Sequence, residues 1–360
     1  MKPRAGDWVE VRSREEILRT LDKNGRLEGL PFMPQMFGYC GRRLRVYKRA
    51  HKTCDTVNQT GGRRVTRAVH LETRCDGEAY GGCQSGCLIF WKEAWLRPVA
   101  SSLATTHLAS AATGPVPAPS YTEADVWSGT KNPEKGEDGE PRYICQATEL
   151  PAFTTRLPWW DVRQYFEDFF SGNATLGRIL RGAAYSFYSN LAQAGIGLGR
   201  PMRLVYDLFQ KVVGGIPYPR RKGKIPAGQS TPTCALGLRP GELVRVKSFK
   251  EILATLDTGK LNRGLYFDPE HVPYCGGTYR VKTRVEKYIE EKTGRLKTLK
   301  NPSVILEGVW CRSRYSDCRM FCPRSIYSWW REVWLERVQD AGGQGPPPDI
   351  SEDGSSPWKP

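Results

Sequence analysis

Two stretches of the chain decide its fold: residues 6–22, GDWVEVRSREEILRTLD, and residues 241–257, GELVRVKSFKEILATLD. They align without a gap at an offset of 235 residues, and the match runs on to residues 46 and 281 with 19 of 41 positions identical. Similarity at a fixed offset over this length is typical of a repeated structural unit. The sequence therefore predicts a tandem duplication.

Each copy predicts mostly strand with one short helix. Residues 8–11 and 243–246 alternate apolar and polar side chains, which is the period of a strand with one buried face. A capping box, serine followed three residues later by glutamate, precedes a helix that ends near Leu21 or Leu256; the pairs are Ser13 with Glu16 and Ser248 with Glu251. We expect an α+β protein with two homologous, mostly-β modules of the SH3-like barrel type, joined by a basic helical segment.

Further turn signals lie inside the copies. Gly29 and Gly264 occupy matching positions and predict turns with positive φ. Residues 292–294, Lys-Thr-Gly, lie between β-favouring runs of copy two and predict a hairpin.

Each copy keeps four cysteines where the sequences otherwise diverge. They are Cys40, Cys75, Cys83 and Cys87 in copy one, and Cys275, Cys311, Cys318 and Cys322 in copy two. Four thiolates are the number that a tetrahedral zinc site takes, and a C-x3-C pair in each set fits a ligand loop. The sets predict two independent structural Zn²⁺ sites per chain. An iron–sulfur cluster, which also takes four cysteines, is the alternative, and buried inert thiols are the third interpretation.

Three cysteines fall outside these sets: Cys54, Cys145 and Cys234. Cys54 lies in His51-Lys52-Thr53-Cys54, where a histidine and a lysine are positioned to lower the pKa of a thiol and make it reactive. Copy two has no equivalent of this sequence. His51 and Cys54 are therefore the candidate catalytic residues if the protein is an enzyme, and a surface histidine beside a half-buried thiol is the plainer interpretation.

Composition suggests five segments. Residues 1–99 and 236–340 are the two modules, residues 100–142 resemble a flexible linker, residues 143–235 are a connecting segment, and residues 341–360 resemble a disordered tail. Within the connecting segment, residues 158–214 predict three amphipathic helices, with Asn173 as the cap of the second. We expect their apolar stripe to pack against the modules. Lying on an anionic membrane surface is the alternative.

The chain carries a formal net charge of +16 and eleven cysteines. The charge favours an acidic partner: in order, a protein, an anionic membrane surface or nucleic acid. No apolar run is long enough to span a membrane, and the first residues lack the apolar core of a secretion signal. Many cysteines without an export signal are typical of a reducing compartment. We expect a cytoplasmic protein, with peripheral membrane attachment as a variant of that expectation.

Nucleotide-binding and hydrolase motifs are absent: there is no Walker loop, no G-x-G-x-x-G after a strand, no G-x-S-x-G and no H-E-x-x-H. Two hypotheses remain. The first is a zinc-bearing binding or scaffold protein that acts through its basic surface. The second is an iron–sulfur enzyme or redox protein, moving electrons or sulfur, with Cys54 as a reactive thiol. A nucleic-acid-binding protein is a weaker third.

Several longer motifs, among them HKTCD, GGCQSGCLIFWKEAWLRPV, YICQATELP and WWREVWLERV, make the chain look like a group of uncharacterised bacterial proteins. The resemblance covers most of the chain outside the linker and the tail. It implies a shared architecture with two tandem four-cysteine modules and a bacterial cytosolic setting. It implies no activity.

Overall fold

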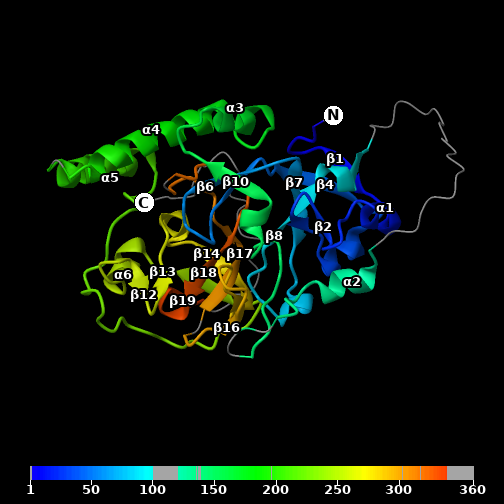
Figure 1. The fold of residues 1–360 in the computed structure, drawn as a ribbon. Helices are drawn as coiled ribbons and strands as arrows, with labels where there is room; N and C mark the ends of the chain where they lie inside the picture. Colours follow the sequence, from blue (N-terminus) through cyan, green and yellow to red (C-terminus); the bar gives the residue numbers. More distant parts are fainter. Residues whose placement is uncertain are drawn as a thin grey trace, which may run out of the picture. The chain divides into compact units, whose positions relative to one another are not determined.

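The computed structural model of the chain describes residues 2–99, 121–134, 136, 139–195, 197–301, 303–316 and 318–338. The fold is mixed α and β (Figure 1). It divides into two compact units. Unit 1 comprises the described residues within Met1–Thr175, Lys287–Lys297 and Cys322–Arg324. Unit 2 comprises those within Leu176–Glu286, Thr298–Phe321 and Ser325–Pro360.

Unit 1 is built on a curled five-stranded antiparallel sheet. Its strand order is β8-β7-β4-β1-β9. The strands are β1 (Trp8–Val11), β4 (Arg43–Arg49), β7 (Ala68–Arg74), β8 (Leu88–Lys92) and β9 (Leu96–Pro98). A second sheet of three strands has the order β10-β6-β5 and comprises β5 (Lys52–Cys54), β6 (Gly62–Val65) and β10 (Thr154–Leu157).

Short elements complete unit 1. The strand pairs are β2 (Arg26–Leu27) with β3 (Leu30–Pro31), and β15 (Lys287–Ile289) with β16 (Leu296–Thr298). The α-helices are α1 (Arg14–Leu18), α2 (Glu123–Ser128) and α3 (Arg163–Phe170). The 3-10 helices are η1 (Pro34–Tyr39), η2 (Glu78–Tyr80), η3 (Glu93–Trp95) and η4 (Leu150–Ala152).

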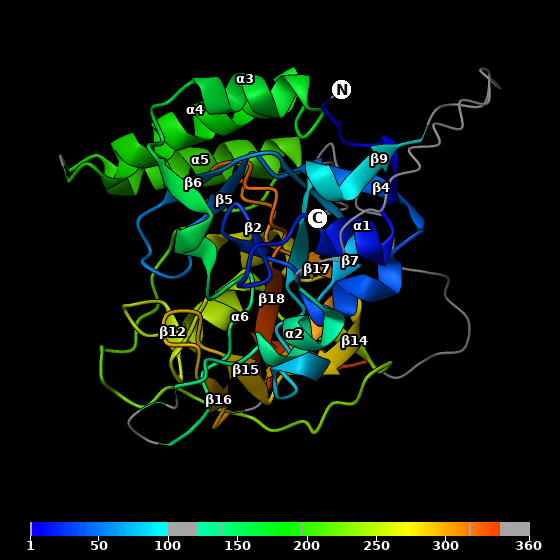
Figure 2. The ribbon, with the colours of Figure 1, turned by 45° about the vertical axis from the view of Figure 1, so that its right-hand side comes forward.

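Unit 2 has a five-stranded antiparallel sheet with the order β18-β17-β14-β11-β19. The strands are β11 (Leu243–Val246), β14 (Thr278–Arg284), β17 (Ser303–Trp310), β18 (Tyr327–Arg331) and β19 (Leu335–Arg337). The remaining elements are β12 (Leu261–Asn262), β13 (Leu265–Tyr266), α4 (Leu176–Gln193), α5 (Gly199–Val213), α6 (Phe249–Ala254), η5 (Pro269–Tyr274) and η6 (Glu332–Trp334). Helices α4 and α5 lie side by side (Figure 2).

The strands of the two large sheets correspond in order. Each sheet runs from the edge strand that follows the cysteine loop, β8 or β18, to the short closing strand, β9 or β19. A register shift interrupts β4–β7 between Val46 and Lys48, and the same shift interrupts β14–β17 between Val281 and Thr283. These positions differ by 235 residues, the offset of the repeat. The predicted opening strands, the two capping boxes, the positive φ of Gly29 and Gly264 and the hairpin around residues 292–294 are all present.

Matching tryptophans close the two cores. Trp95 Nε1 donates a hydrogen bond to Thr20 Oγ1, and Trp334 Nε1 donates to Thr255 Oγ1, both at 2.9 Å. Each tryptophan ring also meets a phenylalanine ring edge-on with centroids 5.2 Å apart: Phe32 with Trp95, and Phe267 with Trp334. Buried indoles that satisfy their N–H in this way combine a large apolar contact with a fixed orientation.

The two units do not follow the boundaries suggested by composition. Part of the predicted linker is folded, because Thr122 and Asp125 form a capping box that starts α2 and Val126 is buried in the core of unit 1. The connecting segment divides between the units after Thr175. The hairpin of β15 and β16, which comes from copy two, packs within unit 1 through Ile289. Residues 100–120 and the predicted tail 341–360 lie outside the described residues.

A buried histidine in β7 makes the stability of unit 1 depend on pH. His70 is fully buried, and its Nδ1 lies 2.9 Å from the carbonyl oxygen of Ile89, so that this nitrogen donates. Burial lowers the pKa of His70 to about 3, against an ordinary value of 6.5. Below pH 6.5, His70 therefore binds a proton in the unfolded chain but stays neutral in the folded chain. The free energy of unfolding falls as the pH drops toward 3.

We expect this histidine alone to remove about 1.4 kcal/mol of stability for each pH unit between 6.5 and 3. In a His70→Gln variant that part of the pH dependence is expected to disappear. Hydrogen exchange of the β7 and β8 amides at pH 7 and pH 4.5, compared between the variant and the unmodified chain, measures it. Parallel pH profiles for the two proteins would contradict the assignment.

Candidate metal centre

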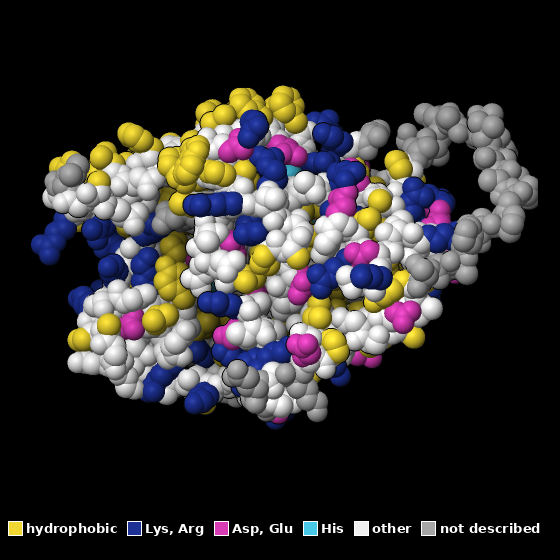
Figure 3. Space-filling view, in the orientation of Figure 1, with side chains coloured by type: hydrophobic (Ala, Val, Ile, Leu, Met, Phe, Trp, Pro, Cys, Tyr) yellow, Lys and Arg dark blue, Asp and Glu magenta, His cyan; other side chains and the backbone are white. Residues whose placement is uncertain are grey.

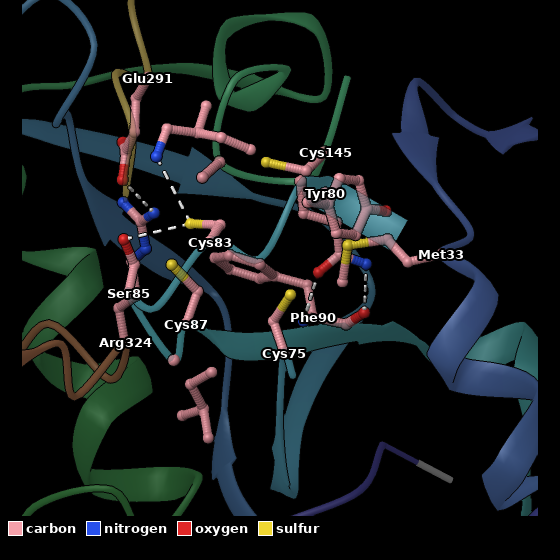
Figure 4. A pocket seen from close by; sticks show the side chains of 15 residues that line it. Met33, Cys75, Tyr80, Cys83, Ser85, Cys87, Phe90, Cys145, Glu291 and Arg324 are labelled. Atoms are coloured by element: carbon pink, nitrogen blue, oxygen red, sulfur yellow. Dashed lines mark hydrogen bonds and ion pairs between the residues drawn. The ribbon is translucent and has the colours of Figure 1, made fainter. Parts of the chain in front are cut away.

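Four cysteines line one cavity in unit 1 (Figure 4). They are Cys75, Cys83, Cys87 and Cys145. The cavity measures about 40 Å³, which is room for an ion or a water molecule and not for a larger ligand. These four cysteines are free thiols. No disulfide therefore competes with metal binding at these four positions.

The ends of two neighbouring strands bring three of these cysteines together. Cys75 directly follows β7 and donates its N–H to the carbonyl oxygen of Cys87, which directly precedes β8, at 2.8 Å. Between them the chain turns at Gly77, whose φ is +79°. A Cβ atom on Gly77 would lie 1.9 Å from the carbonyl oxygen of Cys83. Glycine is thus required for the turn that returns Cys83 to the other two.

The fourth cysteine arrives from a distant part of the sequence. Gln146 fixes this segment to β8, because its Oε1 accepts the N–H of Phe90 at 2.8 Å and its Nε2 donates to the Phe90 carbonyl at 3.0 Å. On the other side of Cys145, Tyr143 donates its N–H to the carbonyl oxygen of Gly294 at 2.8 Å. Cys145 is therefore held between β8 and the copy-two hairpin.

Nitrogen donors reach two of the sulfur atoms. Gln35 Nε2 donates to Cys75 Sγ at 3.2 Å, and the N–H of Ile289 donates to Cys83 Sγ at 3.4 Å. Donors of this kind orient metal ligands and stabilise negative charge on sulfur. The Ile289 donor comes from β15, so the copy-two hairpin contributes directly to the surroundings of the copy-one cysteines.

The thiols of this cluster resist ionisation in the absence of a metal. Burial raises the pKa of Cys87 to about 12 and that of Cys145 to about 11, and it raises the pKa of Cys75 further still. The neighbouring cysteines act in the same direction on all three groups. Within the described residues, no three His, Cys, Asp or Glu side chains already stand in the arrangement of a bound metal site. Metal binding here would displace protons and draw the sulfurs together.

A buried cation stands next to the cysteine cavity. Arg324 also lines the cavity, is 1% exposed, and donates to Glu291 Oε1 at 3.1 Å and to Thr56 Oγ1 at 2.7 Å. Burial acts to lower the pKa of Arg324, but Glu291 and the thiols of Cys54, Cys87 and Cys322 outweigh that effect and raise it. Arg324 thus stays charged, which places a fixed positive charge beside the sulfur atoms.

Cys40, the fourth member of the copy-one set expected from the repeat, does not line this cavity. It caps the end of η1, and burial raises its pKa, with Arg14 and Glu15 as the nearest charged influences. Cys145 stands in its place beside Cys75, Cys83 and Cys87. Sequence comparison missed Cys145 because it lies outside both copies of the repeat.

The four cysteines of the copy-two set are divided between the units. Cys275, Cys311 and Cys318 belong to unit 2, and Cys322 belongs to unit 1. Cys275 is buried with its sulfur 3.8 Å from the carbonyl oxygen of His271, and Cys318 is exposed. In unit 1, Cys322 Sγ accepts the N–H of Cys54 at 3.2 Å.

His51 and Cys54, the candidate catalytic pair, are both buried, with 3% and 5% of their surfaces exposed. His51 Nε2 lies 3.2 Å from Asp168 Oδ1, and Lys52 Nζ donates to Asp168 Oδ2 at 2.6 Å. Lys52 Nζ also donates to Gln164 Oε1 at 3.2 Å. The structure thus places His51 in a buried polar cluster that anchors α3, and it places Cys54 against Cys322.

Unit 2 contains a much larger cavity of about 1020 Å³, where α4 and α5 meet η5. Aromatic and basic side chains line it, among them Tyr185, Tyr206, Tyr274, Tyr315, Arg312 and Arg314. Cys275 lies on its wall. Sequence analysis did not identify this cavity, because its tyrosines are scattered over residues 185–315.

Comparison of the chain with protein-family models, with curated proteins and with solved structures gave no match. The function is therefore argued from the site itself.

Proposed function

We propose that the protein binds one structural Zn²⁺ ion in unit 1 and acts as a binding or scaffold protein. The ligands are Cys75, Cys83, Cys87 and Cys145. The observation that carries this proposal is the convergence of four half-buried free thiols, from separated parts of the sequence, on one small cavity. A structural zinc site is closed by four protein ligands, and thiolate sulfur is a preferred ligand.

Charge balance supports four thiolates at this position. Zinc bound by four thiolates carries a net charge of about −2. The buried guanidinium of Arg324 lies against the same cavity and offsets part of that charge. Among the ion pairs of the described residues, Glu291 is the only carboxylate partner of Arg324. An anionic zinc site would give this buried guanidinium a second one.

The size of the cavity favours zinc over an iron–sulfur cluster. A space of about 40 Å³ suits a single ion, whereas a cluster brings several iron and sulfide atoms with it. An iron–sulfur protein with Cys54 as a reactive thiol remains the second candidate from sequence. The burial of Cys54 against Cys322 gives that thiol no open approach in unit 1.

The zinc would join the parts of unit 1 that the sequence separates most widely. It would fasten the β7–β8 loop to the segment around Cys145, and the copy-two hairpin packs over both. A scaffold role through the basic surface follows from the net charge of +16, which favours an acidic partner.

Metal content and colour test the proposal on anaerobically purified full-length protein. We expect a colourless protein with zinc at one equivalent per chain from unit 1, and release of protons when zinc is added to the metal-free form. A brown protein with charge-transfer absorption near about 400 nm would replace zinc by an iron–sulfur cluster. Metal-free protein that gains no stability from added zinc would overturn the metal site altogether.

A further inference from the structure

Helix α5 carries large apolar side chains that are exposed. Six large apolar residues are exposed along it, and Val212 keeps 80% of its surface. They are Leu204, Val205, Leu208, Phe209, Val212 and Val213. Their spacing of one, three and four residues places them on one face of the helix. No residue of α5 is buried.

The polar side of α5 is the side that is attached. Asp207 Oδ1 accepts the N–H of Tyr218 at 2.8 Å, and Asp207 Oδ2 pairs with Arg221. The ring of Tyr206 contacts that of Tyr218, with centroids 5.6 Å apart. The helix is therefore held to unit 2 through its polar and tyrosine side chains. Val205, Phe209 and Val213 line the large cavity of unit 2, while Leu204, Leu208 and Val212 are exposed outside that lining.

Helix α4 has the same inverted arrangement. Its buried residues are Gly182, Ser189 and Ala192, all small, and a Cβ atom on Gly182 would lie 2.5 Å from the ring of Phe321. Small residues on this face permit close packing on unit 2. The predicted apolar stripe lies on the opposite face, with large side chains at Leu176, Leu180, Phe187 and Leu191 exposed. The prediction that this stripe packs against the modules is therefore wrong for α4.

Helix α3, in unit 1, repeats the pattern independently. Its buried residues are the polar Gln164 and Asp168, while Phe166 and Phe170 are more than half exposed. Trp159 and Trp160 precede the helix and are also exposed. Figure 3 shows hydrophobic side chains on the outer surface of α3 and, in unit 2, on that of α4. Exposed apolar helix faces of this kind mark interaction surfaces.

The charge of residues 176–224 favours an anionic partner. Residues 176–224 contain nine basic residues and one acidic residue. Arg200 and Lys211 are exposed and, being eleven residues apart, lie on the same side of α5 at the edge of its apolar face. Basic residues flanking an apolar face are the signature of a helix that lies in the surface of an anionic membrane. The same charges repel a second copy of the chain.

We propose that α4 and α5 dock unit 2 on a membrane surface that contains anionic lipid. The outer stripe of α4, together with Leu204, Leu208 and Val212 of α5, enters the boundary between headgroups and acyl chains. The flanking arginines and lysines bind the phosphates. Among the described residues no helix is long and apolar enough to cross a bilayer, so the helices lie in the surface. This inference does not depend on the zinc site.

Vesicle sedimentation of the full-length chain tests the docking. We expect binding to phosphatidylcholine vesicles in which one third of the lipid is phosphatidylglycerol, weaker binding to pure phosphatidylcholine, and a loss of binding as salt is raised. Val212→Glu is expected to weaken binding at least about tenfold, because the hydrocarbon contact is replaced by a charge. Trp127→Glu, at an exposed apolar residue on α2, is the matched control and is expected to bind as before.

Two further measurements keep the proposal open to refutation. Circular dichroism and zinc content of Val212→Glu should equal those of the unmodified chain, which separates lost docking from lost folding. Equal binding to neutral and anionic vesicles, or none to either, would overturn the proposal. Self-association in lipid-free buffer that Val212→Glu abolishes would assign the face to a second copy of the chain instead.

Discussion

Replacing Cys145 with serine is expected to remove the zinc from unit 1 and to destabilise that unit strongly. A serine hydroxyl is a poor zinc ligand, and the remaining three thiols cannot close a tetrahedral site. Because a structural metal is bound in the folded state and not in the unfolded chain, loss of the proposed zinc should appear directly as lost folding free energy. The expected result is zinc near zero in unit 1 and a lower thermal midpoint.

Cys40→Ser is the matched control, since the repeat alone assigns Cys40 and not Cys145 to the set. We expect Cys40→Ser to keep its zinc, with a change in stability of at most about 1 kcal/mol for a half-buried position. Elemental analysis and thermal unfolding of the two variants side by side decide between them. Zinc retained by Cys145→Ser and lost by Cys40→Ser would restore the set that the repeat predicts and reject the one proposed from the cavity.

Asp168→Ala is expected to destabilise unit 1 by about 3–5 kcal/mol, although it lies on a surface helix. Asp168 is fully buried and is the carboxylate that pairs with Lys52 and lies against His51. Burial lowers the pKa of Lys52, and Asp168 acts to raise it. Removing the carboxylate leaves the lysine buried without its counter-ion, so the loss should shrink as the pH rises and Lys52 becomes neutral.

The contrasting variant is Phe166→Gln on the same helix. Phe166 is 62% exposed, and we expect its replacement to change the free energy of unfolding by no more than about 0.5 kcal/mol. Denaturant unfolding followed by hydrogen exchange of the β5 and α3 amides compares the two. A loss for Phe166→Gln as large as that for Asp168→Ala would mean that α3 is held by its apolar face, contrary to the buried Gln164 and Asp168.

Local signals in the sequence were sufficient for the elements themselves. The capping boxes at Ser13 and Ser248 act within four residues, and the alternation in residues 8–11 and 243–246 fixes which side chains face the core. The exceptions are α2, which lies in the predicted linker, and Asn173, predicted as the cap of the second helix. Its amide instead pairs with the backbone of Arg49, donating to the carbonyl oxygen at 2.8 Å and accepting the N–H at 2.9 Å.

The repeat predicted less well which residues lie together in the structure. It groups residues by similarity of sequence, so it assigned Cys40 to the cysteine set and left Cys145 aside. The path of the chain after residue 139 brings Cys145 back to β8 through Gln146. In the same way, the hairpin of β15 and β16 belongs to copy two by sequence and to unit 1 by packing.

Sequence by itself determined the mixed α and β class of this protein, the opening strand and capped helix of each copy, and the thiol chemistry that four cysteines per copy make available. Only the tertiary structure decided which four thiols share a cavity and which side of α4 and α5 faces solvent. Periodicity reports that a helix has an apolar face, but the side that packs depends on the partner surface. Here small residues such as Gly182 fit that surface closely, and the large apolar side chains are left outside.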